Sequence, residues 1–535
     1  MRKIIIVALV MLAFAIFAPI ALHASDINVI IDGITVDFEE RQPIIVDGRT
    51  LVPVNSVFEA LGFDVTWETQ GFDVVWEQTM PTATLTKGDD VMLISIGYDT
   101  FYVNGTINAL DVPAQIIKGE LMLPLRALAE GIGYFVDWDY GTVIIGTSYD
   151  FVTIQGIRYS IERTTLDLND MGLTCEDIVP VQYMQNLTSL ALISGEIRDL
   201  RPLAGLTNLT QLNLRNNQIN DLRPLAGLTN LTTLVLTVNN IGNEDLAPLA
   251  ALENLRSLTL SANRITDLTA LSTLVHLEEL FVGNSGTRHI NQISNLALLP
   301  NFPNLTTLSI WGNGISDITP LAGFEGLREL SLGHNQISDI SILSKFTNLD
   351  TLSLWGNNIS DISPLAGLTN LTDLSLGFNE ISDLGKLSEL TNLTRLILPR
   401  NGISDIATLA KLEHLEILEL QFNDISNIAP LAGLANLREL NLGYNQISDL
   451  NPLSGLTNLE ELTLQFNDIS NIAPLAGLAN LRELNLFRNR INNLAPLAGL
   501  ANLEWMDVRV NYWIHSWQPV EHVPVVRGSP WDIRN

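Results

Sequence analysis

Cysteine and basic residues are scarce in this chain of 535 residues. Its one cysteine, Cys175, excludes an intrachain disulfide framework and any metal site built from several cysteines. Lysine and arginine together number 29, against 59 aspartates and glutamates, and the net charge at pH 7 is −30. Because nucleic acid and anionic membranes are themselves negatively charged, we expect neither of them as a partner.

Recognisable catalytic motifs are also missing. The seven histidines are scattered, and no nucleophile–base pair, metal cluster or phosphate-binding loop stands out. Cys175 has no histidine near it in the sequence, so we expect it to pack as a small apolar residue, with a reactive thiol as the alternative. The sequence therefore predicts a protein that is not an enzyme, with no catalytic residue, no metal site and no cofactor.

One long apolar run stands at the N-terminus. Arg2 and Lys3 precede it, and it ends in small residues near Ala24, a pattern typical of a secretory signal peptide. We predict residues 1–24 to be this signal, with an uncleaved membrane anchor as the alternative because the run is long enough to span a bilayer. Since the C-terminal residues show no apolar tail, we expect a secreted, extracellular protein without a membrane span after cleavage, either free or associated with the cell wall.

A repeat of 22 residues fills residues 181–511. Nine steps of 22 lead from Leu299 to Leu497 without an insertion or deletion, and such a fixed period marks a solenoid. Within one unit, Leu440 and Leu442 alternate with polar neighbours, which predicts a short strand with both leucines pointing inward. One coil cannot cover its own apolar face, so neighbouring coils must stack on it.

The ends of the repeat region depart from this pattern. We predict an N-terminal cap over 151–180 and a C-terminal cap over 512–535, because the end coils leave an apolar face open. We expect bulky rings to cover the last coil, with a separate aromatic binding site as the alternative: Trp505, Tyr512, Trp513, Trp517 and Trp531. An insertion of six residues that contains Arg288 and His289 is expected to bulge outward from the stack.

The segment 25–150 contains a different, internal duplication. Each half predicts a strand, a helix that a proline opens, a glycine that closes it and a second strand, which together make a duplicated α+β domain. The dipeptides Asp32-Gly33 and Asn104-Gly105 predict tight hairpin turns. Five residues recur 71 positions later: Gly48, Pro53, Gly62, Val65 and Trp67, as Gly119, Pro124, Gly133, Val136 and Trp138.

Two known families share these patterns. The repeat, L-x-x-L-x-L-x-x-N-x-I-x-D-L-x-P-L-x-x-L, resembles the leucine-rich repeat of bacterial internalins, and 25–150 resembles the N-terminal stalk domain of copper amine oxidases. The resemblance implies a curved horseshoe with a concave parallel β-sheet and convex short 3-10 or loop segments, behind the α+β domain. The resemblance does not imply oxidase activity, because that chemistry needs a separate catalytic domain with three copper-binding histidines.

Asparagine recurs at one place in each repeat. A side-chain amide both donates and accepts hydrogen bonds, so a buried ladder of them would satisfy the backbone at the turn after each strand. The aspartates of the I-x-D segment, such as Asp361, are expected to cap the next short turn, with a calcium site as the alternative. The ladder comprises Asn217, Asn239, Asn263, Asn313, Asn335, Asn357, Asn379, Asn401, Asn423, Asn445, Asn467 and Asn489.

Variation at the outward strand positions predicts where a partner binds. An aromatic column would supply contact area, and an acidic column beside it would steer a partner. The aromatic column contains Trp311, Trp355, Phe378, Phe422, Tyr444, Phe466, Phe487 and Trp505, with His334 in line. The acidic column contains Glu279, Glu329, Asp373, Glu419, Glu439, Glu461, Glu483 and Asp507.

The resemblance to internalins implies adhesin-like recognition of a protein or a glycan on a cell surface. The acidic face favours a basic protein as this partner. The alternative is a structural protein of the cell envelope, which the stalk domain would tether to wall polymer. Partial packing of Phe422 and Phe466 against neighbouring coils is the competing interpretation of their place in the aromatic column.

Overall fold

The chain divides into two compact units. The first reaches Thr164 and takes in residues 177–186, and the second contains residues 165–176 and the chain from Leu187 onward. The predicted signal residues 1–24, the Asp32-Gly33 turn, Arg288, His289 and Trp531 fall outside the described part. The computed structural model describes residues 27–31, 34–38, 42–46, 49–68, 82–117, 120–139, 142–146, 151–284 and 290–528.

The first unit confirms the predicted duplication. In the first half, strand β4 (Arg49–Pro53) leads into helix α2 (Val54–Ala60) and strand β5 (Asp64–Glu68). The second half repeats this order with β11 (Glu120–Pro124), α3 (Leu125–Gly131) and β12 (Phe135–Asp139). Each proline lies one residue before its helix, at the end of the strand, rather than in the first turn.

The two helices of this unit pack against strands of three antiparallel or mixed sheets. Their strand orders are β12-β13-β1-β2, β10-β11-β4-β3 and β5-β6-β7-β8-β9, and β14 and β15 form a separate hairpin. Asn104 and Gly105, both with positive φ, turn β8 into β9, as predicted. The remaining strands are β1 (Asn28–Ile31), β2 (Ile34–Thr35), β3 (Ile44–Val46), β6 (Thr82–Lys87), β7 (Asp90–Ser95), β8 (Thr100–Val103), β9 (Thr106–Ala109), β10 (Gln115–Ile117), β13 (Thr142–Gly146), β14 (Phe151–Ile154) and β15 (Ile157–Ser160).

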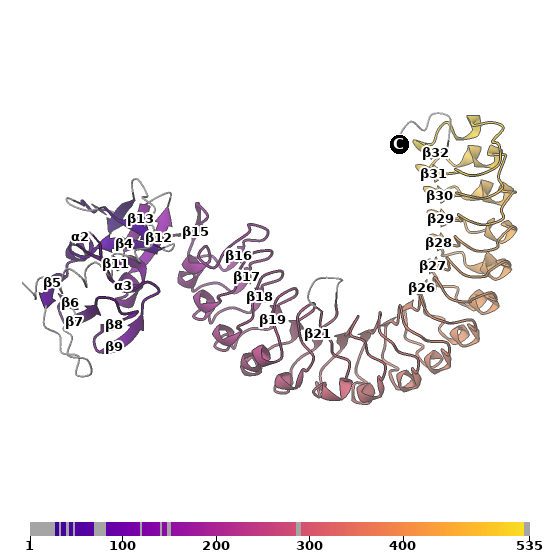
Figure 1. The fold of residues 1–535 in the computed structure, drawn as a ribbon. Coiled ribbons are helices and arrows are strands. Elements are labelled where there is room, and N and C mark those ends of the chain that lie inside the picture. Colours follow the sequence, from indigo (N-terminus) through magenta and orange to yellow (C-terminus); the bar gives the residue numbers. More distant parts are fainter. Residues whose placement is uncertain are drawn as a thin grey trace, which may run out of the picture. The chain divides into compact units, whose positions relative to one another are not determined.

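The second unit is built on one parallel sheet of 17 strands, in chain order from β16 to β32. Figure 1 shows these strands along the inner edge of the curved repeat array. The strands are β16 (Thr165–Asp167), β17 (Ser189–Ala191), β18 (Gln211–Asn213), β19 (Thr233–Val235), β20 (Ser257–Thr259), β21 (Glu279–Phe281), β22 (Thr307–Ser309), β23 (Glu329–Ser331), β24 (Thr351–Ser353), β25 (Asp373–Ser375), β26 (Arg395–Ile397), β27 (Ile417–Glu419), β28 (Glu439–Asn441), β29 (Glu461–Thr463), β30 (Glu483–Asn485), β31 (Trp505–Asp507) and β32 (Val525–Arg527).

Short 3-10 turns form the outer side of the array (Figure 1). A proline often stands in their first turn, where its missing N–H costs nothing. The turns are η1 (Val179–Tyr183, grouped with the first unit), η2 (Arg201–Leu203), η3 (Arg223–Leu225), η4 (Glu244–Ala251), η5 (Thr269–Leu271), η6 (Leu296–Leu298), η7 (Thr319–Gly323), η8 (Ser341–Lys345), η9 (Ser363–Leu365), η10 (Gly385–Glu389), η11 (Ala407–Lys411), η12 (Ala429–Gly433), η13 (Asn451–Leu453), η14 (Ala473–Gly477), η15 (Ala495–Gly499) and η16 (Gln518–Val520).

The leucines converge inside the stack, as their spacing predicts. Leu440 in the middle of β28 is 2% exposed, and Leu442, Ile447 and Leu450 of the same coil are as deeply buried. Burial of each such side chain contributes about 1.5–3 kcal/mol before the loss of chain entropy. Among the residues that the structure describes, no helix combines the length and apolar character that crossing a membrane requires.

The N-terminal boundary of the array differs from the predicted cap. The interval 151–180 is divided, because the hairpin of β14 and β15 groups with the first unit whereas β16 pairs in parallel with β17. Cys175 is half-buried, and its sulfur accepts hydrogen bonds from the backbone N–H groups of Arg198 (3.2 Å) and Asp199 (3.4 Å). It therefore takes part in the packing of the first coils.

The predicted aromatic cover at the C-terminal end is wrong for two of its residues. Tyr512 is 58% exposed and Trp513 is 84% exposed, so neither covers the last coil. Instead β32 adds a further parallel strand to β31, and Val520, Val523 and Val526 are buried in this additional coil. Valines can replace the rings because they occupy the interior places that leucines hold in the preceding coils.

Candidate functional site

The buried asparagine ladder ties each coil to the one before it. The side-chain oxygen of Asn239 accepts a hydrogen bond from the backbone N–H of Ile219 (3.0 Å) in the preceding coil. Its amide group donates to the carbonyls of Leu214 (3.0 Å) and Leu236 (3.1 Å). Each of the predicted ladder asparagines accepts an N–H and donates to a carbonyl of the coil before it. These residues support the fold, and their amides are not free for a ligand.

One ladder asparagine, Asn291, escaped the sequence prediction. Its side chain accepts from the backbone N–H of Ile265 (2.9 Å) and donates to the carbonyl of Leu260 (3.0 Å), which are the bonds of the ladder. The insertion displaces it from the regular 22-residue spacing. In the other repeats the ladder asparagine stands two residues before an isoleucine, so the position of Ile293 would have identified Asn291.

A second asparagine ladder runs through the exposed turns that follow the 3-10 segments. Asn370 donates to the carbonyl of Thr347 (2.8 Å), and Asn392 donates to that of Thr369 (2.9 Å). These residues were not predicted from the sequence, although the T-N-L and A-N-L triplets recur with the repeat. They explain why the outer turns also keep a constant spacing.

The aspartates cap the short turns, as predicted. The carboxylate of Asp361 accepts the backbone N–H of Ser363 at 2.8 Å, and hydrogen bonds to Ser363 lower the pKa of Asp361. Hydrogen bonds from Arg223 lower the pKa of Asp221 to about 2. Within the described residues, no group of three or more histidine, cysteine, aspartate or glutamate side chains is placed to hold a metal ion.

Aromatic side chains from successive coils stack just beyond the ends of the strands. The rings of Phe422 and Tyr444 lie with centroids 4.0 Å apart and planes inclined by 16°, and Tyr444 and Phe466 repeat this geometry. The Arg400 guanidinium lies 4.5 Å from the ring centroid of Phe422. The ring ladder, as we call this set, contains Trp311, His334, Trp355, Phe378, Phe422, Tyr444, Phe466 and Phe487.

Backbone conformation and small residues fix the ring ladder in place. Phe422, Tyr444 and Phe466 have positive φ, between 54° and 60°, which is unfavourable for residues with a side chain. Gly377 is required for a different reason, which is the space that the Trp355 ring occupies. A Cβ at Gly377 would lie 2.5 Å from an atom of this ring. The stacking therefore accompanies backbone strain, and the rings have little freedom to reorient.

Strand register corrects the membership of both predicted columns. Trp505 stands opposite Glu483, so it continues the line of glutamates and does not belong to the ring ladder. Glu419 stands opposite Asn441 and therefore lies two residues away from the line of Glu439. Asp507 stands opposite Asn485 in the same shifted position. The physical reason is that two residues along a strand project on one face about 7 Å apart, so residue type alone does not define a line.

Three glutamates occupy matching positions on neighbouring strands. Glu439, Glu461 and Glu483 begin β28, β29 and β30 and stand opposite one another in register. We call them the glutamate row. Partial burial raises the pKa of Glu461, and repulsion from Glu439 and Glu483 raises it further.

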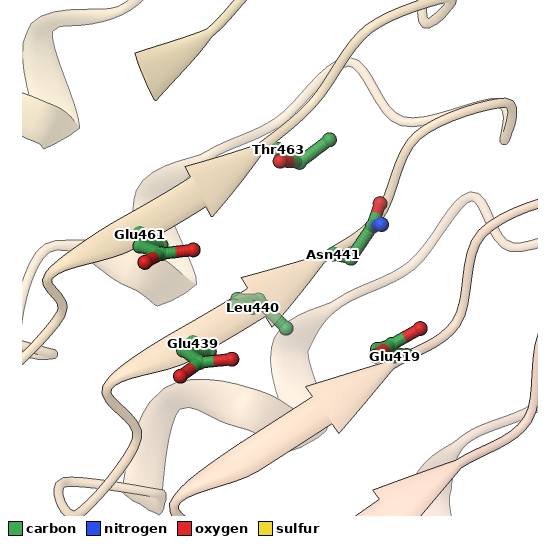
Figure 2. A pocket seen from close by; sticks show the side chains of 6 residues that line it. All are labelled: Glu419, Glu439, Leu440, Asn441, Glu461 and Thr463. Atoms are coloured by element: carbon green, nitrogen blue, oxygen red, sulfur yellow. The ribbon is translucent and has the colours of Figure 1, made fainter. Parts of the chain in front are cut away.

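A shallow hollow lies between the glutamate row and the strand ends. Figure 2 shows the side chains of Glu439 and Glu461 next to each other on adjacent strands, with Asn441 and Thr463 further along these strands. The other acidic residues of the same line lie further back in the array. Glu329 is exposed on β23, whereas Asp373 on β25 pairs with Arg395 at 3.3 Å. The inner face of the sheet thus presents carboxylates, and the rings stack just beyond the ends of its strands.

Family comparisons agree with this two-unit architecture. The family model of the copper amine oxidase N-terminal domain matches residues 30–145. No curated protein matches the chain. The family model of leucine-rich repeats matches residues 207–251, 303–345, 325–367, 347–390, 413–456, 435–477 and 457–502.

Several solved structures are similar to the chain. An internalin of Listeria monocytogenes is 32% identical over 66% of this chain and 98% of that chain, with a TM-score of 0.49. Internalin C2 of the same organism is 39% identical over 36% of this chain and 86% of its own, with a TM-score of 0.34. A leucine-rich repeat protein of Leptospira interrogans is 25% identical over 68% of this chain and 96% of its own, and its TM-score of 0.58 reflects the shared repeat fold.

Proposed function

The chain belongs to the internalin-like leucine-rich repeat proteins and carries a copper amine oxidase N-terminal domain, and on this premise we propose that it is a secreted or cell-surface binding protein without enzymatic activity. Its repeat array recognises a protein on a cell through the inner face of the 17-stranded sheet. The role is that of an adhesin. Secretion follows from the predicted signal at residues 1–24.

The ring ladder is the observation that carries this proposal. Phe378 is 42% exposed and Phe422 is 37% exposed, although each packs against a neighbouring ring or guanidinium. Exposed rings that are held rigid supply contact area at a low cost in conformational entropy, which is what a protein-binding surface requires. Partial packing of Phe422 and Phe466 against neighbouring coils is therefore compatible with binding.

The geometry of the rings favours a protein over a glycan as the partner. Sugars bind aromatic residues through the ring face, but both faces of the Tyr444 ring are covered, by Phe422 on one side and Phe466 on the other. What remains accessible is the ring edge. Apolar side chains and carbonyl groups of a protein can contact such an edge, whose hydrogens carry the positive end of the quadrupole.

Alanine variants of the ring ladder test the proposal. We expect the combined Trp311→Ala, Trp355→Ala and Tyr444→Ala variant to bind intact cells at least ten times more weakly than the unaltered chain, because hot-spot aromatics contribute about 2 kcal/mol or more each. Flow cytometry with fluorescently labelled protein on a panel of cell types measures this binding. The matched control replaces Tyr512 and Trp513, which are exposed outside the ring ladder. Equal binding by the ladder variant and the unaltered chain contradicts the proposal.

A second candidate function is the tethering of the array to cell-wall polymer by the N-terminal domain. One observation favours it: Leu93, Tyr102 and Ile107 stand in register across β7, β8 and β9 and are 39%, 43% and 62% exposed. Co-sedimentation of the full chain with purified wall polymer tests this function. We expect Tyr102→Ala together with Ile107→Ser to abolish co-sedimentation, whereas retention of the variant on the polymer refutes this face as the tether.

A further inference from the structure

The glutamate row places like charges side by side on neighbouring strands. Adjacent strands of a sheet lie about 4.8 Å apart, and like charges directly opposite each other destabilise strand pairing. In the described part of the chain, no ion pair joins Glu439, Glu461 or Glu483 to a basic residue. The three carboxylates therefore cost stability in the free protein.

Charges are neutralised one residue before the glutamate row. The residue that precedes each row glutamate is alternately basic and acidic, and these side chains form ion pairs between neighbouring coils. Arg438 lies 3.7 Å from Glu460, and Arg482 lies 3.4 Å from Glu504. Arginines are thus available one residue away, yet they pair with other carboxylates and leave the glutamate row open.

The ring ladder borders the other side of the same coils. Along the described strands, the residues on this face between the glutamate row and the rings are uncharged: Asn441, Gly443, Thr463, Gln465 and Asn485. The face of β28, β29 and β30 therefore has a negative side at the start of the strands and an aromatic side beyond their ends. A partner that fits both sides needs positive charges along one flank and apolar groups along the other.

We infer that this face binds an amphipathic α-helix of a partner protein, with a stripe of lysines or arginines on the glutamate row and apolar side chains against the ring ladder. The inference rests on the proposed function and adds the chemistry and conformation of the ligand. The helix lies across the strands, along the direction in which the carboxylates recur. Its charges neutralise the row that the protein itself leaves open.

Spacing selects a helix over an extended segment. Two steps along the glutamate row span about 9.6 Å, because strands are about 4.8 Å apart. Two turns of an α-helix span about 10.8 Å, a difference that flexible lysine side chains absorb. Side chains on one face of an extended segment recur about every 6.7 Å, and two such steps span about 13.4 Å. This span is about 4 Å longer than the two steps of the glutamate row.

A designed peptide provides the probe for this inference. It is an alanine-rich peptide of about 20 residues, long enough to be partly helical in water, with lysines at i, i+4 and i+7 and leucines on the adjacent flank. The control peptides have the same composition, with the lysines distributed around the helix, or contain a central proline. Fluorescence anisotropy with the full chain should show at least tenfold tighter binding of the striped peptide than of either control, and weaker binding at high salt.

Isosteric variants connect the binding to the glutamate row. The combined Glu439→Gln, Glu461→Gln and Glu483→Gln variant removes three charges at constant shape and should weaken binding of the striped peptide about tenfold or more. The matched control, Glu253→Gln with Glu325→Gln and Glu413→Gln, removes the same charge from exposed turns after η4, η7 and η11. We expect this control to change binding less than about twofold, by long-range steering alone.

Three outcomes overturn the inference. They are equal affinity for the striped and control peptides, equal loss in the two glutamine variants, and no binding of the striped peptide to the unaltered chain. Each of them leaves the proposed function standing if the Trp311, Trp355 and Tyr444 variant still loses binding to cells. The proposed function is contradicted by a separate result, namely cell binding that does not depend on the rings.

Discussion

The rings of Tyr444 and Phe466 stack with centroids 4.0 Å apart, although the two residues belong to different coils and are separated by 22 positions in the chain. The same spacing brings Phe422 onto the other face of Tyr444. A feature that repeats once per coil thus becomes a continuous contact along the array. This relationship makes the ring ladder both a structural element and a candidate binding surface, and stability measurements can separate the two roles.

Replacement of Tyr444 by alanine should lower the free energy of unfolding. The substitution removes two ring–ring contacts of about 0.5–1.5 kcal/mol each, so we expect a loss of about 1–3 kcal/mol. Chemical denaturation followed by circular dichroism measures the effect. Tyr444→Phe is the matched control and should stay within about 0.5 kcal/mol, because it keeps both stacks. A Tyr444→Ala variant as stable as this control would show that the stacking contributes little.

Gly377→Ala should destabilise the array through steric overlap. The added Cβ would lie 2.5 Å from an atom of the Trp355 ring and 2.8 Å from Cδ of Pro399. Forcing extra volume into a packed site costs about 1–3 kcal/mol. Thermal unfolding and the tryptophan emission spectrum report this change. Gly367→Ala is the control, since a Cβ there meets no atom within 4 Å, and a larger effect at Gly367 would contradict the assignment.

The two asparagine ladders should differ in energetic importance. Asn423→Ala leaves the buried N–H of Ile403 without its partner, at a cost of about 1–3 kcal/mol, while the carbonyl of Leu398 keeps its hydrogen bond from Asn401. Asn370→Ala removes an exposed hydrogen bond to Thr347, and water replaces it at a cost of about 1 kcal/mol or less. Denaturant unfolding of both variants gives the comparison. Equal losses would mean that burial does not set the difference.

The pH dependence of stability should change when Glu461 is replaced by glutamine. Its native pKa is raised, so protonation favours the folded state, and this contribution is lost as the pH rises through the native pKa. Glu461→Gln should therefore raise the free energy of unfolding at pH 7 by less than about 1 kcal/mol, because the group is exposed, and leave it unchanged below about pH 4. Glu413→Gln, on an exposed turn outside the glutamate row, is the matched control. Destabilisation by Glu461→Gln at pH 7 would indicate a favourable partner for the carboxylate.

Secretion is tested at the N-terminus. If residues 1–24 are a cleaved signal, the protein recovered from the medium of a bacterial host should begin at Ser25. N-terminal sequencing or intact-mass measurement reads this directly. A mass that retains the apolar run, with the protein in the membrane fraction, would indicate the uncleaved anchor instead.

The 22-residue period by itself determined the solenoid, the inward leucines, the buried asparagine ladder and the aspartate-capped turns. The reason is that a fixed period forces equivalent residues into equivalent places, so that burial of Leu440 and hydrogen bonding of Asn239 follow from one coil and its copies. The same logic at a spacing of 71 positions identified the duplicated N-terminal domain. Asn291 was missed because an insertion interrupts the period, not because its chemistry differs.

Only the tertiary structure decided which residues face each other between coils. Trp505 was grouped with the rings by its chemistry, although it lies 22 positions after Glu483 and the period alone places it opposite that glutamate. The period does not show that residues one and two positions before the ladder asparagine, such as Phe378 and Trp355, contact each other across coils. These contacts depend on the positive φ at residues such as Tyr444 and on the space above Gly377. Backbone conformation and side-chain volume act across coils, whereas sequence periodicity reports the position within a coil only.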